Sequence, residues 1–330
     1  MKILTRGTIR GLQAGFILLI AALLTTPMAA HGQNYPARDI SFIVPYNPGG
    51  GTDPISRQFC GQMEKELKGN INVENRPGGS GTIGAGVVVR AKPDGYTIGL
   101  GSNTILGFQP LVNPGLSFKK PGDYQPIVKL MDQHVNLVVR KDAPWKTFDD
   151  FMDDVRKNPG KIRASVSGKW GQPDLVVQQL NKAAKVKITT VPFTGGAGEA
   201  LIALLGGRIE ANIGTAASTL GHIQSGSIRA LAVFKKGKHE LFPEAAPVGD
   251  LGYDATIPSA YYVIAPKGLP KDVLDKLVSA SLRVVRSQDY AKFCKPHGYE
   301  VDPKGPEELT AELNLYLRQF ADLIKFLDQK

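Results

Sequence analysis

The chain alternates short β-rich runs, glycine-containing turns and helical patterns along most of its length. The first such unit has the β-rich run Ile40–Val44, a turn over Pro45–Gly51 and a helical pattern with apolar residues four positions apart from Ile55 to Leu67. The same order recurs at 71–91, and later at 162–184 and 188–205. Regular alternation of strand and helix is typical of α/β layers built on parallel sheets. We therefore predict an α/β fold.

The length of the chain, 330 residues, predicts more than one compact unit. Single hydrophobic cores stop growing at about 250–300 residues, so two lobes are expected. The last segment, Glu307–Lys330, carries an apolar stripe typical of a helix packed on a sheet.

The first 32 residues have the order of a secretory signal peptide. Lys2, Arg6 and Arg10 precede an apolar run from Ala14 to Leu24, and small residues follow. The alternative is a membrane anchor, but the run is short for a membrane span. We predict cleavage after Gly32, secretion into an oxidising compartment and a mature chain of residues 33–330.

Charge and motif content argue against several function classes. The formal net charge of +10 falls to +7 when the three basic residues of the signal segment are subtracted. The remaining basic residues form no long runs with interleaved aromatic residues, which disfavours nucleic-acid binding. Gly79–Gly84 matches the G-x-G-x-x-G dinucleotide pattern, but residues 75–77 separate it from the preceding β-rich run, so the pattern lacks its usual context. The four scattered histidines of the predicted mature chain have no metal-ligand spacing, so neither a metal nor a cofactor is predicted.

Cys60 and Cys294 are the two cysteines of the chain. Both lie in helix-like segments with apolar neighbours. In an oxidising compartment a disulfide can form, and two buried thiols are equally compatible with this pattern.

Two turns in the chain resemble each other. Residues 44–50 read Val-Pro-Tyr-Asn-Pro-Gly-Gly, and residues 191–196 read Val-Pro-Phe-Thr-Gly-Gly, each between a strand and a helix. Helix N-termini carry unpaired N–H groups and partial positive charge, and glycines let the backbone approach a ligand. Because ligands of open α/β sheets bind beyond the carboxyl ends of strands, we predict that the two turns hold one anion, such as a carboxylate, from opposite sides.

At these residues the chain resembles the substrate-binding receptors of tripartite tricarboxylate transporters, also called Bug receptors. The similarity extends over essentially the whole predicted mature chain. It rests on residues 35–36, 43–53, 73–78, 91–97, 158–161, 204–207, 228–233 and 265–270.

The resemblance implies a two-lobe periplasmic-binding-protein fold, of the type II-like Venus-flytrap form, with a ligand cleft between the lobes. Lobe 1 would comprise residues 33–137 and 233–330, and lobe 2 residues 138–232. It further implies a periplasmic, monomeric receptor without enzymatic activity. Such a receptor binds a small carboxylate and passes it to the membrane subunits of the transporter.

Carried over residue by residue, the resemblance also implies a set of ligand-binding positions. They come from the two similar turns, from a loop after a lobe 1 strand and from the loop near residue 170: Tyr46, Pro48, Gly49, Gly50, Thr52, Asp53, Ser102, Asn103, Ser167, Gly168, Gln172, Thr194, Gly195, Gly196 and Ala197.

Two positions depart from the pattern of the family, and both belong to the predicted pocket. Relatives often carry Gly-Ser-x-x-His where this chain has Gly171-Gln172-Pro173-Asp174-Leu175, and Lys169-Trp170 add a residue to this loop. Relatives also commonly carry a lysine where this chain has Thr194. Trp170 can stack on an aromatic ligand or pack the loop. These departures leave the ligand unidentified. Two other roles stay open: a sensory carboxylate-binding module, and a secreted enzyme using Asp53 or Glu199.

Overall fold

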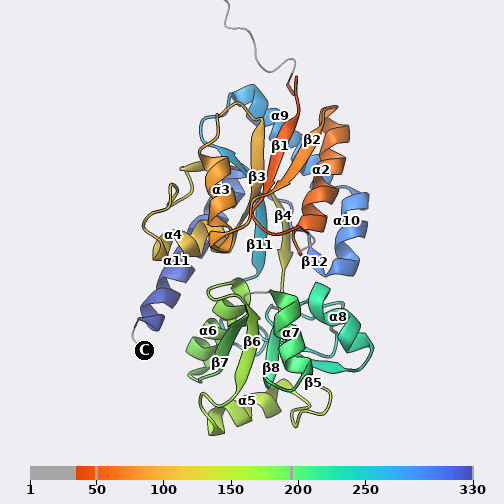
Figure 1. The fold of residues 1–330 in the computed structure, drawn as a ribbon, viewed down its shortest axis with the longest axis vertical. Helices are drawn as coiled ribbons and strands as arrows, with labels where there is room; N and C mark the ends of the chain where they lie inside the picture. The colour runs from red at the N-terminus through yellow and green to blue at the C-terminus, as the bar shows by residue number, and fades with distance from the viewer. Residues whose placement is uncertain (1–34, 49–50, 194–195, 329–330) are drawn as a thin grey trace, which may run out of the picture. The chain divides into compact units, whose positions relative to one another are not determined.

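The computed structural model describes residues 35–48, 51–193 and 196–328. Residues Pro36–Lys330 form one compact unit, and this unit contains two six-stranded sheets (Figure 1). The predicted signal segment, residues 1–32, lies outside the described residues. We call the sheets, with the helices that cover them, lobe 1 and lobe 2.

Lobe 1 has the strand order β12-β4-β11-β3-β1-β2. Its strands are β1 (Ile40–Val44), β2 (Ile71–Asn75), β3 (Thr97–Ser102), β4 (Tyr124–Gln133), β11 (Ser259–Pro266) and β12 (Tyr299–Glu300). Its helices are α2 (Asp53–Leu67), α3 (Thr82–Val89), α4 (Gln109–Val112), α9 (Lys271–Val285), α10 (Gln288–Cys294) and α11 (Pro306–Leu327), with the short turns η1 (Gly79–Gly81), η2 (Thr104–Phe108) and η3 (Lys295–His297).

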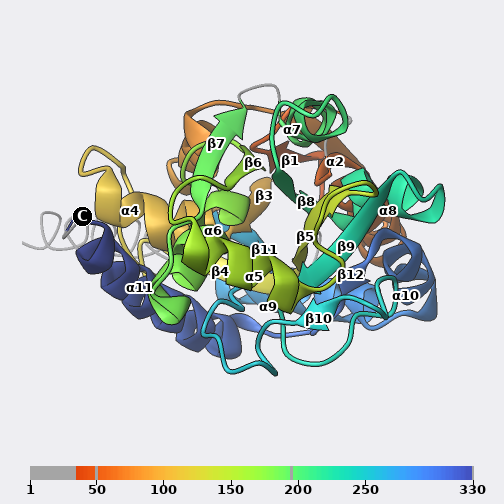
Figure 2. The same ribbon diagram turned by 90° about the horizontal axis from the view of Figure 1, so that it is seen from below.

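Lobe 2 has the strand order β10-β9-β5-β8-β6-β7. Its strands are β5 (Val135–Arg140), β6 (Arg163–Ser167), β7 (Thr189–Phe193), β8 (Ala211–Thr215), β9 (Ile228–Val233) and β10 (Ala246–Pro247). Its helices are α5 (Phe148–Lys157), α6 (Gln172–Ala184), α7 (Ala197–Leu205) and α8 (Ala216–Gln224) (Figure 2).

The two sheets share one topology over five strands. In lobe 1, β1 pairs in parallel with β2 and β3, and β11 runs antiparallel between β3 and β4. In lobe 2, β6 pairs in parallel with β7 and β8, and β5 runs antiparallel between β8 and β9. The α/β prediction is confirmed, but the expectation of parallel sheets is wrong. In each sheet one antiparallel strand enters from the other lobe and needs no helical crossover. In lobe 1 the short strand β12 also pairs antiparallel with β4.

The chain passes between the lobes twice. It leaves lobe 1 at His134, between β4 and β5, and returns between β10 and β11. The predicted boundary at 137/138 falls inside β5, and the one at 232/233 comes too early. Phe234, Val248 and Ala255 belong to the lobe 2 core, because the chain adds β10 to that sheet before it returns.

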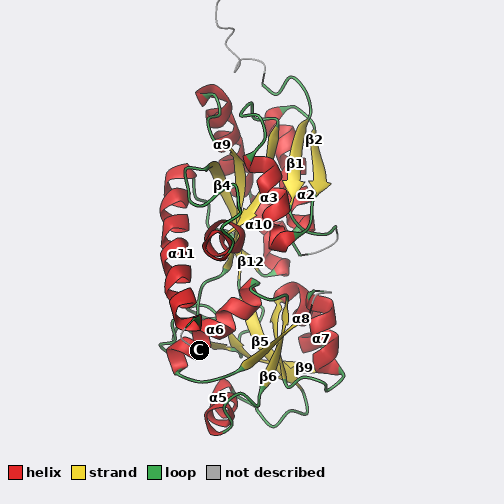
Figure 3. Cartoon of the chain, turned by 60° about the vertical axis from the view of Figure 1, so that its left-hand side comes forward, coloured by secondary structure: helices red, strands yellow, loops and turns green. Residues whose placement is uncertain are grey.

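Helix α11 reaches both lobes (Figure 3). Its buried residues Leu309, Leu313 and Phe320 pack against β4 and η2, as the apolar stripe predicts. Its C-terminal part also contacts α6, where Lys182 Nζ donates to the Asp322 carbonyl oxygen over 3.2 Å. The helix therefore packs on its own sheet and on a helix of the other lobe.

Cys60 and Cys294 are free, buried thiols on α2 and α10. The structure thus contains the second of the two alternatives that the sequence left open. Burial raises the pKa of the Cys60 thiol, which keeps it protonated near neutral pH.

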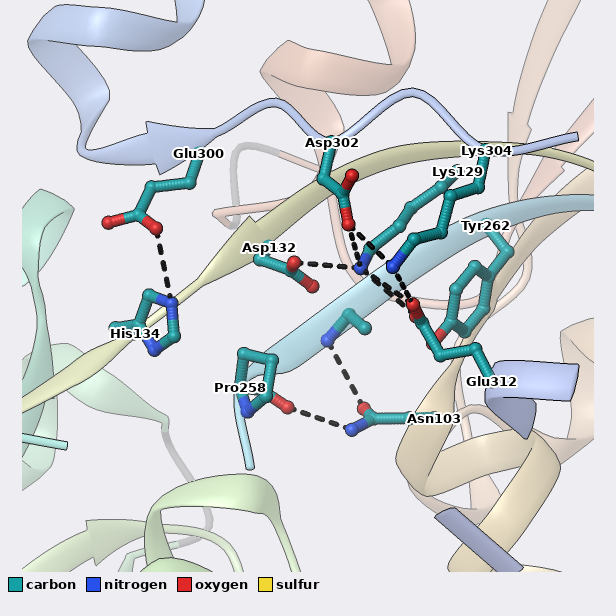
Figure 4. A network of polar contacts seen from close by, with 11 residues as sticks. Asn103, Lys129, Asp132, His134, Pro258, Tyr262, Glu300, Asp302, Lys304 and Glu312 are labelled. Atoms are coloured by element: carbon teal, nitrogen blue, oxygen red, sulfur yellow. Dashed lines mark hydrogen bonds and ion pairs between the residues drawn. The ribbon is translucent and has the colours of Figure 1, made fainter. Parts of the chain in front are cut away.

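Charged side chains from β4, α11 and the segment between β12 and α11 gather around the buried Lys129 (Figure 4). The ammonium group of Lys129, whose side chain is 2% exposed, lies 2.7 Å from a carboxylate oxygen of Asp132 and 3.0 Å from one of Glu312. Lys304 pairs with Glu312 and Asp302. Burial raises the pKa of Asp132, and the nearby Lys129 opposes this shift. The cluster joins β4 to α11 just before the crossing at His134.

We predict that Lys129→Met lowers the free energy of unfolding by about 3–5 kcal/mol, because it leaves the buried Asp132 carboxylate without its cation. Urea denaturation measures the loss. It should shrink as the pH falls, since protonation of Asp132 then removes the uncompensated charge. Lys271→Met is the control: its ion pair with Asp275 is exposed, and its loss should cost less than about 1 kcal/mol. Equal losses in the two variants would contradict this role for the cluster.

Candidate functional site

A cavity of about 410 Å³ lies between the two lobes. Its described lining residues come mostly from the carboxyl ends of β1, β2 and β3 in lobe 1 and of β6, β7 and β8 in lobe 2. The end of β4 and the start of β11, which is antiparallel, complete the same edge. This is the edge at which ligands of open α/β sheets bind, so the topology places the cavity where binding is expected.

The turn after β1 forms one wall of the cavity, and hydrogen bonds from Asn75 of β2 support it. Asn75 at the end of β2 donates from Nδ2 to the Tyr46 carbonyl oxygen and to Asp53 Oδ1, both over 3.0 Å. Arg57 Nε, one turn into α2, donates to Asp53 Oδ2 over 3.0 Å. Asp53 thus starts α2 and binds Asn75, which holds the Tyr46 carbonyl oxygen, and it is not among the lining residues.

Three hydroxyl groups from lobe 1 form a chain in the cavity wall. Tyr46 Oη lies 3.4 Å from Ser102 Oγ, which lies 2.9 Å from Thr104 Oγ1. Ser102 Oγ also accepts from the Ile105 amide over 3.2 Å. Burial raises the pKa of Tyr46, so its hydroxyl keeps its proton at neutral pH. Since hydroxyls both donate and accept, this chain can adapt to either kind of ligand atom.

The turn after β2 forms the neighbouring part of the same wall. Gly78 and Gly81 have backbone φ angles of 119° and 92°, a region that residues with a Cβ atom rarely adopt. Gly84 of α3 lies so close to the β1 turn that a Cβ would come within 2.8 Å of Pro45 Cα and of the Arg76 carbonyl oxygen. Gly84, the last glycine of the rejected dinucleotide pattern, therefore serves the close packing of α3 against the β1 turn.

Lobe 2 contributes the loop after β6, including Ser167, Gly168, Lys169 and Trp170. Trp170 has φ of 60°, and its amide donates to Asp174 Oδ2 over 2.9 Å. Its ring lies 5.8 Å from that of Phe108 in lobe 1, and the side chain also lines the cavity. Trp170 thus packs between the lobes and not only within its own loop, which was one sequence-based alternative, while remaining able to contact a ligand.

Gln172, the first residue of α6, is buried in the cavity wall. Its Nε2 donates to the Ile257 carbonyl oxygen over 2.8 Å, on the segment that returns to lobe 1. Asn103 holds the same segment from the other lobe: Nδ2 donates to the Pro258 carbonyl oxygen over 2.8 Å, and Oδ1 accepts from the Ala260 amide over 3.3 Å (Figure 4). The side-chain amide of Asn103 therefore holds the crossing segment, and the residue does not line the cavity.

The structure brings together six of the predicted site residues in the cavity lining: Tyr46, Ser102, Ser167, Gly168, Gln172 and Gly196. Five others lie near but do not line it: Pro48, Thr52, Asp53, Asn103 and Ala197. Thr52 precedes α2 without a side-chain capping bond, and Ala197 begins α7. Gly49, Gly50, Thr194 and Gly195 lie outside the described residues.

The two similar turns are not topological equivalents. The first follows β1, which lies between two strands, and the second follows β7, which lies at the sheet edge. The counterpart of the β1 turn is the β6 loop at residues 168–171, and the counterpart of the β7 turn is the glycine-rich turn at residues 76–81. Four turns, two from each lobe, therefore surround the cavity.

Several lining residues were missed by sequence reasoning, among them Gln133, Ser259 and Tyr261. Gln133 ends β4, a strand that the sequence pattern did not reveal. Ser259 and Tyr261 begin an antiparallel strand, whose first residues face the cavity only because it enters from the other lobe. The β2 turn could have been found, because it is glycine-rich and follows a predicted strand.

The cavity lining is polar and almost uncharged. Lys169 is the only charged residue among its described members, and none of these is Asp, Glu, His or Cys. Across the described residues, no group of three or more acidic, histidine or cysteine side chains could hold a metal ion. Hydroxyls, amides and one cation suit the binding of an anion with polar substituents.

Comparisons with known proteins agree with this geometry. A model of the tripartite tricarboxylate transporter family receptor matches residues 55–311. BugT of Bordetella pertussis is 29% identical over 78% of this chain and 79% of its own length. A solved structure described as a periplasmic transporter is 31% identical, has a TM-score of 0.78 and covers 88% of this chain and 97% of its own.

A second solved structure contains a ligand. MatC from Rhodopseudomonas palustris with bound malate is 25% identical, has a TM-score of 0.76 and covers 88% of this chain and 100% of its own. The sequence-based prediction of a two-lobe periplasmic-binding-protein fold is confirmed by these matches and by the two sheets.

We predict opposite effects for two helical Gly→Ala substitutions. Gly84→Ala should destabilise the protein by about 1–3 kcal/mol, because the added methyl group pushes α3 away from the Pro45 turn. Gly61→Ala in α2, where nothing lies within 4 Å of the new Cβ, should stabilise it by about 0.4–1 kcal/mol. Thermal and urea unfolding measure both effects. A neutral Gly84→Ala variant would mean that the close approach does not hold the turn.

Proposed function

Because the chain belongs to the tripartite tricarboxylate transporter receptor family, we propose that it binds a small carboxylate between its lobes and delivers it to the transporter's membrane subunits. The solute would occupy the cavity between the four turns. The lobes would close over it by bending at the two crossings, and the closed form would be the one that the membrane subunits recognise.

The observation that carries this proposal is the chemistry of the cavity lining. Its only described charge is the cation of Lys169, while hydroxyls and amides provide directed hydrogen bonds. A carboxylate would therefore meet no described acidic group in the wall. The volume, about 410 Å³, lies within the range of about 300–1,000 Å³ common for small-molecule sites. The malate bound to MatC supports a ligand of this class.

The same lining supports binding without turnover. The described members offer no Asp, Glu, His or Cys as a general base or nucleophile. Asp53, the nearest candidate from the sequence, is paired with Arg57 and Asn75 behind the β1 turn. Glu199 lies in α7 and is not a lining residue.

The location and assembly proposed here follow from the chain and its relatives. Residues 1–32 would direct the protein to the periplasm and be removed there. None of the described helices has both the length and the apolar character that a membrane span requires. A single chain supplies both walls of the cavity, which supports a receptor that works as a monomer.

Ligand binding by the refolded mature protein tests the proposal. We predict that at least one of propionate, lactate, succinate, malate, tricarballylate and citrate raises the melting temperature, since a ligand at 100 times its dissociation constant adds about 2.7 kcal/mol of stability. Succinamide, the neutral diamide of succinate, is the control and should give no shift. NMR of the mixture should show the carboxylate unchanged after prolonged incubation.

Two results would contradict the proposal. If the folded protein is stabilised by none of these carboxylates, the cavity does not bind this class. If a carboxylate is converted into a product, the protein is an enzyme.

A further inference from the structure

The cavity contains a hydrogen-bond acceptor whose polarity is fixed by the fold. Amide side chains can usually be turned to present either nitrogen or oxygen to a ligand. The side-chain nitrogen of Gln172 already has a hydrogen-bond partner, because Nε2 donates to the Ile257 carbonyl oxygen over 2.8 Å. Turning the amide would place two oxygen acceptors against each other, so Oε1 is the amide atom that remains without a protein partner among the described residues.

This acceptor has no protein partner. Gln172 Oε1 is buried and has no hydrogen bond among the described residues. The residue is 7% exposed and belongs to the cavity lining. Buried polar atoms in folded proteins are nearly always hydrogen-bonded, so each exception requires an explanation. At the wall of a binding cavity, the explanation at hand is a partner supplied by the ligand.

A carboxylate alone cannot be that partner. Ionised carboxylate oxygens only accept hydrogen bonds, as Gln172 Oε1 does, and two acceptors in contact repel each other. A ligand group that binds this acceptor directly must therefore be an O–H or N–H donor. A hydroxyl or an ammonium group on the carbon skeleton provides one.

The other buried, unpartnered side-chain atom in the lining is Nε2 of Gln133, at the end of β4 in lobe 1. As a donor it suits a carboxylate oxygen. The structure gives the Gln133 amide no side-chain hydrogen bond that fixes its orientation, and the hydroxyls of Tyr46, Ser102 and Thr104 can donate or accept. These groups adapt to the ligand, whereas Gln172 selects one kind of ligand atom.

We propose that Gln172 makes the cavity specific for hydroxy- or amino-carboxylates over the parent carboxylates that lack the donor group. This inference rests on the proposed function, since it assigns the chemical class of the same ligand. It also gives the sequence departure at Gln172 a role in specificity.

The test compares pairs of carboxylates that differ only by one hydroxyl: lactate and propionate, malate and succinate, citrate and tricarballylate. Aspartate is added to malate and succinate as the amino counterpart. Calorimetric titration of the refolded protein gives each dissociation constant. For the skeleton that binds, we expect the hydroxy or amino form to bind at least about tenfold more tightly, which corresponds to about 1.4 kcal/mol.

The variant Gln172→Met removes the acceptor and keeps a side chain of similar length. Its preference for the hydroxy or amino form should fall to less than about twofold. The preference is a ratio within one variant, so it is insensitive to a loss of stability from the broken bond to Ile257. Gln179→Met on the same helix, also buried but outside this cavity, should keep the wild-type preference.

The outcomes separate this inference from the proposed function. If the unsubstituted carboxylate binds as tightly as its hydroxy and amino forms, or if Gln172→Met keeps the preference, the inference is overturned and the receptor function stands. If none of the carboxylates binds the folded wild-type protein, the proposed function is overturned and this inference with it.

Discussion

The hydrogen bonds that hold residues 257–260 from both lobes are the constraint on which the site depends. Asn103 of lobe 1 binds Pro258 and Ala260, and Gln172 of lobe 2 binds Ile257. These bonds fix where the chain re-enters lobe 1 as β11. Because β11 is antiparallel, its first residues, Ser259 and Tyr261, lie at the same edge as the carboxyl ends of the parallel strands. The crossing and the cavity are thus built from the same few residues.

Gln172 therefore takes part both in the return crossing and in the cavity wall. Its amide nitrogen holds the return crossing, and its unpartnered amide oxygen belongs to a residue of the cavity lining. The parts of lobe 1 that face it are supported independently: the Tyr46 turn by Asn75 and Asp53, and the end of β4 by the buried charges around Lys129. The proposed closure would bend the chain at the two crossings, while α11 and the contact of Trp170 with Phe108 also join the lobes.

Much of the fold could be predicted from local patterns, and the failures have physical causes. The units from β1 to α3 and from β6 to α7 follow strand, turn and helix signals closely. The strand β4 was missed because Pro126, Lys129 and Asp132 interrupt its apolar pattern. The charge cluster around Lys129 was missed because its acidic partners Asp302 and Glu312 are distant in sequence. Helix α10, which lies between α9 and α11, was not predicted. In the site, Gln172 was identified through its departure from the family pattern, whereas Gln133 and Tyr261 depend on strand direction and on the crossings, which no local pattern records.

The central claim is that the solute lies between the lobes, and Trp170 offers the most direct measurement. Trp145, the other tryptophan, is buried in the lobe 2 core, while Trp170 lines the cavity and packs on Phe108. Tryptophan fluorescence is followed while the refolded protein is titrated with the tightest-binding carboxylate, and Trp170→Phe is titrated in parallel. The account predicts a saturable change with the calorimetric dissociation constant, and no such change in Trp170→Phe. Calorimetric binding without any fluorescence change in the wild type would place the solute elsewhere and contradict the account.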